Sequence, residues 1–262
     1  MNKRRSFFSL CLLATIKPVC LLAQQSNDRL AAARKRMVTR HLEERGIKDA
    51  RVLEAFRTVP RHEFIPADVR HLAYEDESIP IGEGQTITPP FDVAFMTESL
   101  APKATDRVYE VGTGSGYQAA ILSRLVKEVY SVEIHRPLAD GAAIVLKKLG
   151  YYNVKSRHGD GYEGWPDAAP FDAVIVTCAP EKVPGPLVEQ LREGGRMVIP
   201  IGDRYNQTVY LMVKKNGKLE QVKALRPTLF VPMTGKAQRE AAAERGKTDS
   251  KPGAAISPKG VK

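Results

Sequence analysis

The stretch Glu110-Val111-Gly112-Thr113-Gly114-Ser115-Gly116-Tyr117 decides the fold of this 262-residue chain. It follows the β-rich run 107–111 and opens a helical pattern over 116–126. Glycine lets the backbone turn sharply and approach a ligand, and the first turn of a helix presents N–H groups that have no partner inside the helix. We therefore expect a strand, a tight turn and a helix that together form part of a ligand site.

Short β-rich runs alternate with helical patterns on the carboxyl side of this turn. Strands are predicted at 107–111, 128–133, 154–158, 173–177 and 196–201, and helices at 116–126, 136–149 and 184–192. This alternation predicts a parallel sheet with helices on both faces, whose ligand crevice lies at the carboxyl ends of the strands. Asn216-Gly217, between β-rich runs at 208–214 and 219–225, predicts a terminal hairpin.

The residues before the sheet read mainly as helices. Apolar residues recur at helical spacing over 28–45 and 50–59, and a further helix is expected over 91–100. Between them, residues 79–90 are rich in Gly and Pro. Such a composition predicts a loop of defined shape that leads toward the sheet.

Acidic residues stand at the ends of the first three predicted strands: Glu110, Glu133 and Asp160. Glu133 lies 19 residues beyond Gly114, a spacing that suits a carboxylate accepting both hydroxyls of a ribose. Asp160 could accept from an adenine amino group, and Glu110 could face an ammonium group. Each acid alone could merely cap a helix or turn. Three at one edge favour a cofactor with ribose, adenine and a positive charge but no phosphate.

The same turn departs from the dinucleotide fingerprint, because Tyr117 stands where that fingerprint has Gly or Ala. A tightly held pyrophosphate is therefore disfavoured. The candidate cofactor-binding residues are Glu110, Gly112, Gly114, Glu133, Asp160 and Gly161.

Seven motifs, in order between Arg34 and Lys236, carry a family resemblance. They are Val59-Pro60-Arg61, Pro80-Ile81-Gly82, Gly84-Gln85-Thr86-Ile87-Thr88, the glycine turn 110–117, His158-Gly159-Asp160-Gly161, Pro170-Phe171-Asp172 and Phe230-Val231-Pro232. With them the chain resembles the protein-L-isoaspartate (D-aspartate) O-methyltransferases. The resemblance implies an α/β, Rossmann-like, seven-stranded methyltransferase fold with an N-terminal helical extension. It also implies a repair enzyme that moves a methyl group from S-adenosyl-L-methionine to the free carboxylate of L-isoaspartyl, and D-aspartyl, residues in damaged proteins and peptides.

The resemblance further implies two acceptor-site residues, Thr88 and Val231. The family loop usually reads Gln-Thr-Ile-Ser, and its serine hydroxyl holds the substrate carboxylate; here the position is Thr88. Threonine keeps the donor but adds a methyl group and restricts χ1, so the role is expected to survive with an altered rate or substrate range. Thr88 could instead be a turn residue that bonds its own backbone. The backbone of Val231 is expected to bind the isoaspartyl segment and to close over the cofactor.

Two other functions stay open at this point. A methyltransferase of small molecules or nucleic-acid bases would share the fold, but amino methyltransferases commonly have Asn/Asp-Pro-Pro-aromatic where this chain has Thr177-Cys178-Ala179-Pro180. A non-catalytic cofactor-binding or interaction module is the other alternative, and only the departure at Thr88 favours it.

Net charge disfavours a nucleic-acid partner. The chain carries +10, but residues 1–40 hold nine basic residues against one acid and residues 236–262 hold seven against three, which leaves −2 for residues 41–235. A slightly acidic body does not resemble a surface for a nucleic-acid duplex.

Cys178 is the only cysteine beyond residue 20 and is expected to be a packed thiol, and the five histidines lack ligand spacing. We therefore expect no metal site. We also expect the protein to be a monomer.

The ends of the chain divide it into three parts: a signal-like leader over 1–27, a methyltransferase domain over 28–238 and a disordered basic tail over 239–262. The leader has basic residues ahead of an apolar run, as in export signals, but the run is too short for a stable membrane span. Cofactor supply and the resemblance favour the cytoplasm. Export or membrane tethering through residues 1–23 is the alternative.

Overall fold

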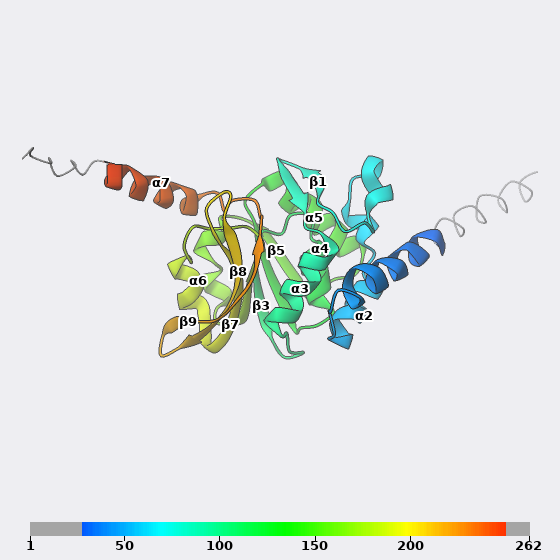
Figure 1. Ribbon diagram of the computed structural model, residues 1–262, viewed down its shortest axis with the longest axis horizontal. Helices are drawn as coiled ribbons and strands as arrows, with labels where there is room; N and C mark the ends of the chain where they lie inside the picture. The colour runs from blue at the N-terminus through cyan, green and yellow to red at the C-terminus, as the bar shows by residue number, and fades with distance from the viewer. Residues whose placement is uncertain (1–27, 250–262) are drawn as a thin grey trace, which may run out of the picture.

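A seven-stranded sheet forms the centre of the computed structural model, which describes residues 28–249 (Figure 1). Its strands are β3 (Arg107–Val111), β4 (Glu128–Glu133), β5 (Val154–His158), β6 (Phe171–Val176), β7 (Leu191–Gly202), β8 (Gln207–Lys215) and β9 (Lys218–Thr228), in the order β5-β4-β3-β6-β7-β8-β9. The first five are parallel, and β8 and β9 are added antiparallel. The strand order reverses between β3 and β6, and such a switch point is where ligands bind in open α/β sheets.

Helices cover both faces of this sheet. The main ones are α2 (Ala50–Thr58), α3 (Pro90–Leu100), α4 (Tyr117–Ser123), α5 (Arg136–Lys148), α6 (Gly185–Gln190) and α7 (Lys236–Asp249). Short turns of 3-10 helix are η2 (Arg61–Phe64), η3 (Ala67–Leu72), η4 (Gly161–Glu163) and η5 (Pro166–Ala168). Residues 28–37 are α-helical and continue as the π-helix η1 (Val38–Glu43). Figure 1 shows the N-terminal helices and α7 at opposite ends of the molecule.

Alternate residues of the central parallel strands β3, β4, β6 and β7 pack into two separate cores. Val108 of β3 joins the core under α2 to α5, whereas its neighbour Tyr109 joins the core under α6. Successive side chains of a strand point to opposite faces, so a strand covered on both sides must be apolar throughout. This explains why most residues of the central strands are apolar, with Glu110 and Ser131 as buried polar exceptions.

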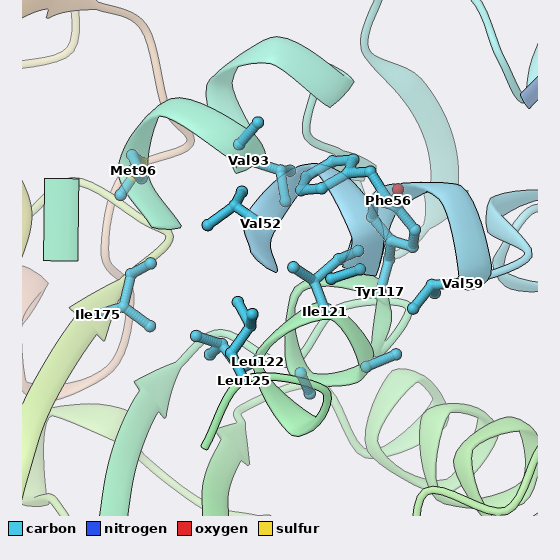
Figure 2. Close-up of a cluster of buried hydrophobic side chains, with 14 of the residues drawn as sticks. Val52, Phe56, Val59, Val93, Met96, Tyr117, Ile121, Leu122, Leu125 and Ile175 are labelled. Carbon is cyan, nitrogen blue, oxygen red and sulfur yellow. The ribbon is translucent and has the colours of Figure 1, made fainter. Parts of the chain in front are cut away.

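The N-terminal extension belongs to the first core. Figure 2 shows side chains of α2, α3 and α4 meeting above the sheet, with Phe56 beside Tyr117. The rings of these two residues cross edge to face at 6.0 Å between centroids, an arrangement that aromatic pairs favour. Asp49 caps α2 by accepting the N–H groups of Arg51 and Val52 at 2.8 and 3.4 Å. The extension is therefore packed against the rest of the domain.

The predicted fold class is confirmed, and every predicted strand is present. Three local features differ. Residues 79–90, expected as a loop, contain the two-stranded ribbon β1 (Ile79–Gly82) and β2 (Gln85–Ile87). The α-helix expected to run to residue 126 ends at Ser123. Residues 161–170, which lack a clear pattern, fold as η4 and η5. Short elements of this kind depend on tertiary contacts more than on local pattern.

The C-terminal tail also differs from the expectation of disorder from residue 239, because α7 continues to Asp249. Its first turns are held by side chains of the body: Tyr162 donates to Glu240 at 2.7 Å, and Lys182 and Glu181 pair with Glu244 and Arg245. These contacts connect α7 to the body of the molecule. Residues 250–262 and residues 1–27, predicted as a leader, lie outside the described residues. Within residues 28–249, no helix is long and apolar enough to cross a membrane.

Candidate active site

A cleft of about 800 Å³ opens at the carboxyl ends of β3, β4, β5 and β6. Its walls come from residues 85–88, 93, 111–115, 117–118, 132–135, 160–161, 177–178 and 231–234. Segments that are far apart in the sequence meet here because parallel strands bring their carboxyl ends to one edge of the sheet.

The glycine turn forms the floor of this cleft. Gly112, Gly114 and Gly116 have φ values of +93°, +53° and +90°, which side chains rarely adopt. A Cβ atom on Gly112 would lie 2.6 Å from the Thr177 Oγ1 atom. That hydroxyl lies 2.9 Å from the carbonyl oxygens of both Val111 and Gly112. The turn is therefore held close to the end of β6, and only glycine fits at its start.

Glu133 lines the cleft, as predicted, and is almost fully buried. Its Oε2 atom accepts the N–H of Gly114 at 2.8 Å, and its Oε1 atom accepts the N–H of His135 at 3.0 Å. An ionised carboxylate has about four acceptor positions, so two backbone donors leave room for two more hydrogen bonds. The side chain thus ties the glycine turn to β4 while it remains able to accept a pair of hydroxyls.

Asp160 and Gly161 also line the cleft, beyond the end of β5. Asp160 accepts the N–H of Tyr162 at 3.0 Å and that of Lys236, the first residue of α7, at 2.8 Å. A Cβ atom on Gly161 would lie 2.4 Å from the Val111 Cγ1 atom. Gly161 is therefore required for close packing against β3, and Asp160 connects this wall of the cleft to the C-terminal helix.

Glu110 is placed differently from the prediction. It does not line the cleft: its side chain is fully buried beneath the glycine turn, where it accepts the Ser131 hydroxyl at 2.5 Å. Burial raises its pKa to about 8, against the lowering effect of the Ser131 hydrogen bond, and the nearby charge of Glu133 raises it further. The side chain of a strand residue points to one face or the other, so a position at a strand end does not by itself aim an acid at the ligand. The expectation that Glu110 faces an ammonium group is not supported by this geometry.

Thr88 and Val231, the two predicted acceptor-site residues, come together on one wall of the cleft. The Val231 carbonyl accepts the N–H of Ala179 at 2.8 Å. Its own N–H makes no hydrogen bond within the described residues. This donor is available to a bound chain.

Arg61 fixes the loop that carries Thr88. Its guanidinium is fully buried, donates from Nη2 to the Thr88 carbonyl at 2.9 Å and lies 4.7 Å from the centre of the Tyr117 ring. Burial lowers its pKa to about 10, so the group stays charged at neutral pH. Arg61 therefore connects the loop that carries Thr88 to Tyr117, the first residue of α4. The sequence shows Arg61 only within a family motif, and no local pattern indicates that so polar a side chain would be buried.

A second cavity of about 1,800 Å³ adjoins the cleft. The two spaces share four lining residues: Thr86, Thr88, Thr177 and Val231. The wall that separates them thus contains both predicted acceptor-site residues. Thr177 was not predicted, although its place directly after β6, beside the ends of the other strands, could have indicated it.

Cys178 lines the cleft beside Thr177. Burial strongly raises the pKa of its thiol, and the charges of Glu133 and Asp160 add to the effect. A thiol that resists ionisation is a poor nucleophile. This geometry agrees with the interpretation of Cys178 as a packed side chain.

Comparison with known proteins agrees with the family resemblance seen in the sequence motifs. The family profile described as "Protein-L-isoaspartate(D-aspartate) O-methyltransferase (PCMT)" matches residues 32–238. A protein-L-isoaspartate O-methyltransferase of Opitutus terrae is 49% identical over 235 residues, which cover 89% of this chain and 98% of the relative. The protein-L-isoaspartate O-methyltransferase 2 of Shewanella sediminis is 44% identical over 240 residues, 92% of this chain and 98% of the relative.

Solved structures agree with the sequence relatives. A solved structure of a protein-L-isoaspartate O-methyltransferase matches with a TM-score of 0.74 at 31% identity. The match covers 81% of this chain and 69% of the solved chain. A Plasmodium falciparum structure described as a protein-L-isoaspartate O-methyltransferase in complex with S-adenosyl-L-homocysteine has a TM-score of 0.67 at 26% identity, over 76% of this chain and 97% of its own. With motifs, fold, cleft and relatives in agreement, the chain belongs to the protein-L-isoaspartate (D-aspartate) O-methyltransferase family.

Proposed function

We propose that this S-adenosylmethionine-dependent protein repair enzyme divides the reaction between its two cavities. The cleft holds the cofactor, and the larger cavity receives the isoaspartyl segment of a damaged protein or peptide. The observation that carries the proposal is the wall shared by the two spaces, in which Thr88 and Val231 lie together. A group held at this wall has the cofactor on one side and the acceptor chain on the other.

The residues of the cleft suit S-adenosylmethionine. Among its lining residues the carboxylates are Glu133 and Asp160, and none is Lys or Arg. Such a lining disfavours a phosphate and favours a ligand with a net positive charge. Glu133 would accept the ribose hydroxyls, Asp160 would accept from the adenine end, and Gly112 and Gly114 would let the backbone approach the ligand. The structure solved with S-adenosyl-L-homocysteine comes from a relative with the same fold.

Positioning is the main contribution of the protein to the reaction. The acceptor carboxylate is ionised at neutral pH, its reference pKa being about 4, so no general base has to activate it. When bound, S-adenosylmethionine supplies a sulfonium methyl group, which a carboxylate oxygen takes to give a methyl ester and S-adenosylhomocysteine. The Thr88 hydroxyl would donate to the other carboxylate oxygen, and the free N–H of Val231 would hold the backbone beside it. Fixing the acceptor in this way is a recognised source of rate.

Substitution of Thr88 tests this arrangement. Thr88→Ser should retain activity, whereas Thr88→Val should lower kcat/KM for an isoaspartyl peptide about 10- to 150-fold, since a hydrogen bond to a charged group contributes about 1.5–3 kcal/mol. Valine keeps the branching and approximate volume and removes only the hydroxyl. Cofactor affinity, measured by calorimetry, should hardly change.

The assay uses labelled S-adenosylmethionine and a pair of peptides that differ only in an isoaspartyl or aspartyl linkage. A base-labile methyl ester should form on the isoaspartyl peptide alone. Equal labelling of both peptides, or full activity of Thr88→Val, would show that the assigned acceptor site is wrong.

Two finer properties are also proposed. The enzyme acts in the cytoplasm, where its cofactor is made, and it acts as a monomer, since one chain carries both cavities. Cell fractionation with mass spectrometry of the N-terminus tests the first, and a mature chain starting near Gln24 outside the cytoplasm would refute it. Sedimentation tests the second, and a stable dimer at assay concentration would refute it.

A further inference from the structure

Two exposed apolar side chains flank the second cavity. Among the described residues, five large apolar side chains are exposed, and Tyr205 and Leu229, at 78% and 73%, are the two that line this cavity. The other three, Ile144, Tyr152 and Val222, line neither the cleft nor this cavity. Isolated apolar side chains on a surface need no explanation, but a pair at the mouth of a cavity indicates a binding surface.

The two segments that carry this pair are held together before any ligand binds. Asp203 accepts the N–H groups of Tyr205 and Asn206 at 2.7 and 2.8 Å, which shapes the turn between β7 and β8. The buried Gln207 side chain then donates to the carbonyls of Asp203 and Phe230 and accepts the N–H of Phe230 at 2.6 Å. These hydrogen bonds connect the turn that carries Tyr205 to the segment that carries Leu229, so the two backbone segments need little ordering when a ligand contacts them.

The charges in this cavity do not select a charged partner. Its only charged lining residues are Asp92 and Arg226, and they pair with each other at 2.9 Å. The Arg226 guanidinium also lies 5.2 Å from the centre of the Phe91 ring, which occupies it further. An acidic or basic side chain of a ligand would have to compete with these contacts, whereas an apolar one would gain surface against Tyr205 and Leu229.

This wall continues from the acceptor site. Phe230, held by Gln207, is followed directly by Val231, whose N–H is free within the described residues. A chain that bonds this N–H in an extended conformation rises about 3.3 Å per residue, so its neighbouring side chains reach the surface beside Val231. In such binding the backbone supplies affinity and the side-chain pockets supply specificity.

We propose that Tyr205 and Leu229 form an apolar subsite that selects isoaspartyl segments with a large apolar side chain within two residues of the isoaspartyl linkage. The inference rests on the proposed acceptor site and deepens it, since it states which damaged sequences the enzyme prefers. Buried apolar segments exposed by damage or unfolding carry such side chains, whereas the polar surface loops of folded proteins seldom do.

The test compares isoaspartyl peptides that differ only in Phe or Ser at one position, in separate pairs for the first and the second residue before and after the isoaspartyl residue. The wild-type enzyme should prefer the Phe peptide of at least one pair in kcat/KM, mainly through KM. Tyr205→Ser and Leu229→Ser should each lower this preference several-fold, and together about 10-fold, the value of roughly 1.4 kcal/mol of lost apolar contact. Both peptides are assayed on one preparation, so a loss of folded enzyme cancels in the ratio.

Tyr152→Ser is the matched control, because Tyr152 is equally exposed but lies between α5 and β5, away from the cavity. It should leave the preference unchanged. Equal use of the Phe and Ser peptides by the wild-type enzyme, or a preference that survives in the double variant, would overturn the subsite while leaving the isoaspartyl activity intact. Failure to methylate any isoaspartyl peptide would instead refute the proposed function, and the subsite with it.

Discussion

Replacement of Glu133 by glutamine separates the role that the structure shows for this carboxylate from the role that we propose for it. The side chain accepts backbone N–H groups from Gly114 and His135, and we propose that it also accepts the ribose hydroxyls of the cofactor. Glutamine preserves the size of the side chain and one carbonyl oxygen, but it removes the negative charge and places an NH₂ group where one oxygen stood. The amide must therefore give up at least one of these acceptor contacts.

The expected loss follows from the hydrogen bonds involved. A hydrogen bond to a charged group contributes about 1.5–3 kcal/mol, so Glu133→Gln should weaken binding of S-adenosylhomocysteine about 10- to 150-fold. Glu133→Ala should weaken it at least as much, because it also releases the N–H of Gly114 and so loosens the glycine turn. Both variants remove the negative charge at position 133.

Calorimetry with S-adenosylhomocysteine and its 2′-deoxy analogue assigns the loss to its cause. The wild-type enzyme should bind the deoxy analogue more weakly, and this difference should shrink in Glu133→Gln. Glu128→Gln is the control, since Glu128 lies at the opposite end of β4, paired with Lys155, and its loss should leave both affinities unchanged. If Glu133→Gln weakens the two ligands by the same factor, the carboxylate only braces the turn and the ribose assignment is wrong.

Two further predictions concern buried ionisable groups. Arg61→Met should lower kcat/KM for an isoaspartyl peptide about 10-fold or more, because it releases the Thr88 carbonyl, and it should change cofactor affinity much less. Arg61→Lys should retain more of the activity than Arg61→Met. If the loss of activity only follows the loss of folded protein in thermal unfolding, the positioning role is wrong. For Glu110, burial raises the folded-state pKa from 4.5 to about 8, so the folded state binds more protons than the unfolded state between these values and the wild-type protein loses stability as pH rises through them. Glu110→Gln lacks this group, so its free energy of unfolding relative to wild type should increase between pH 5 and pH 9, by at most about 5 kcal/mol. Denaturant unfolding at a series of pH values measures this difference. Free energies of unfolding that change in parallel with pH in the two proteins would refute the prediction.

The sheet and its ligand edge could be predicted from sequence because they follow from local periodicity and strict geometric rules. Apolar runs of strand length separated by helical patterns define parallel strands, and parallel strands bring their ends to one edge. Glu133 and Asp160 line the cleft for this reason. Thr88 and Val231, more than 140 residues apart, were paired only through the family resemblance.

Tertiary structure decided the features that depend on side-chain direction and on partners remote in sequence. Glu110 is directed into the core because strand residues alternate between faces, and its position at a strand end does not reveal which face it takes. Arg61 is buried where the carbonyl of Thr88, remote in sequence, accepts one of its hydrogen bonds, and α7 contacts the body through ion pairs. Local sequence sets periodicity and backbone freedom, whereas burial and pairing of polar groups depend on what the fold brings to them.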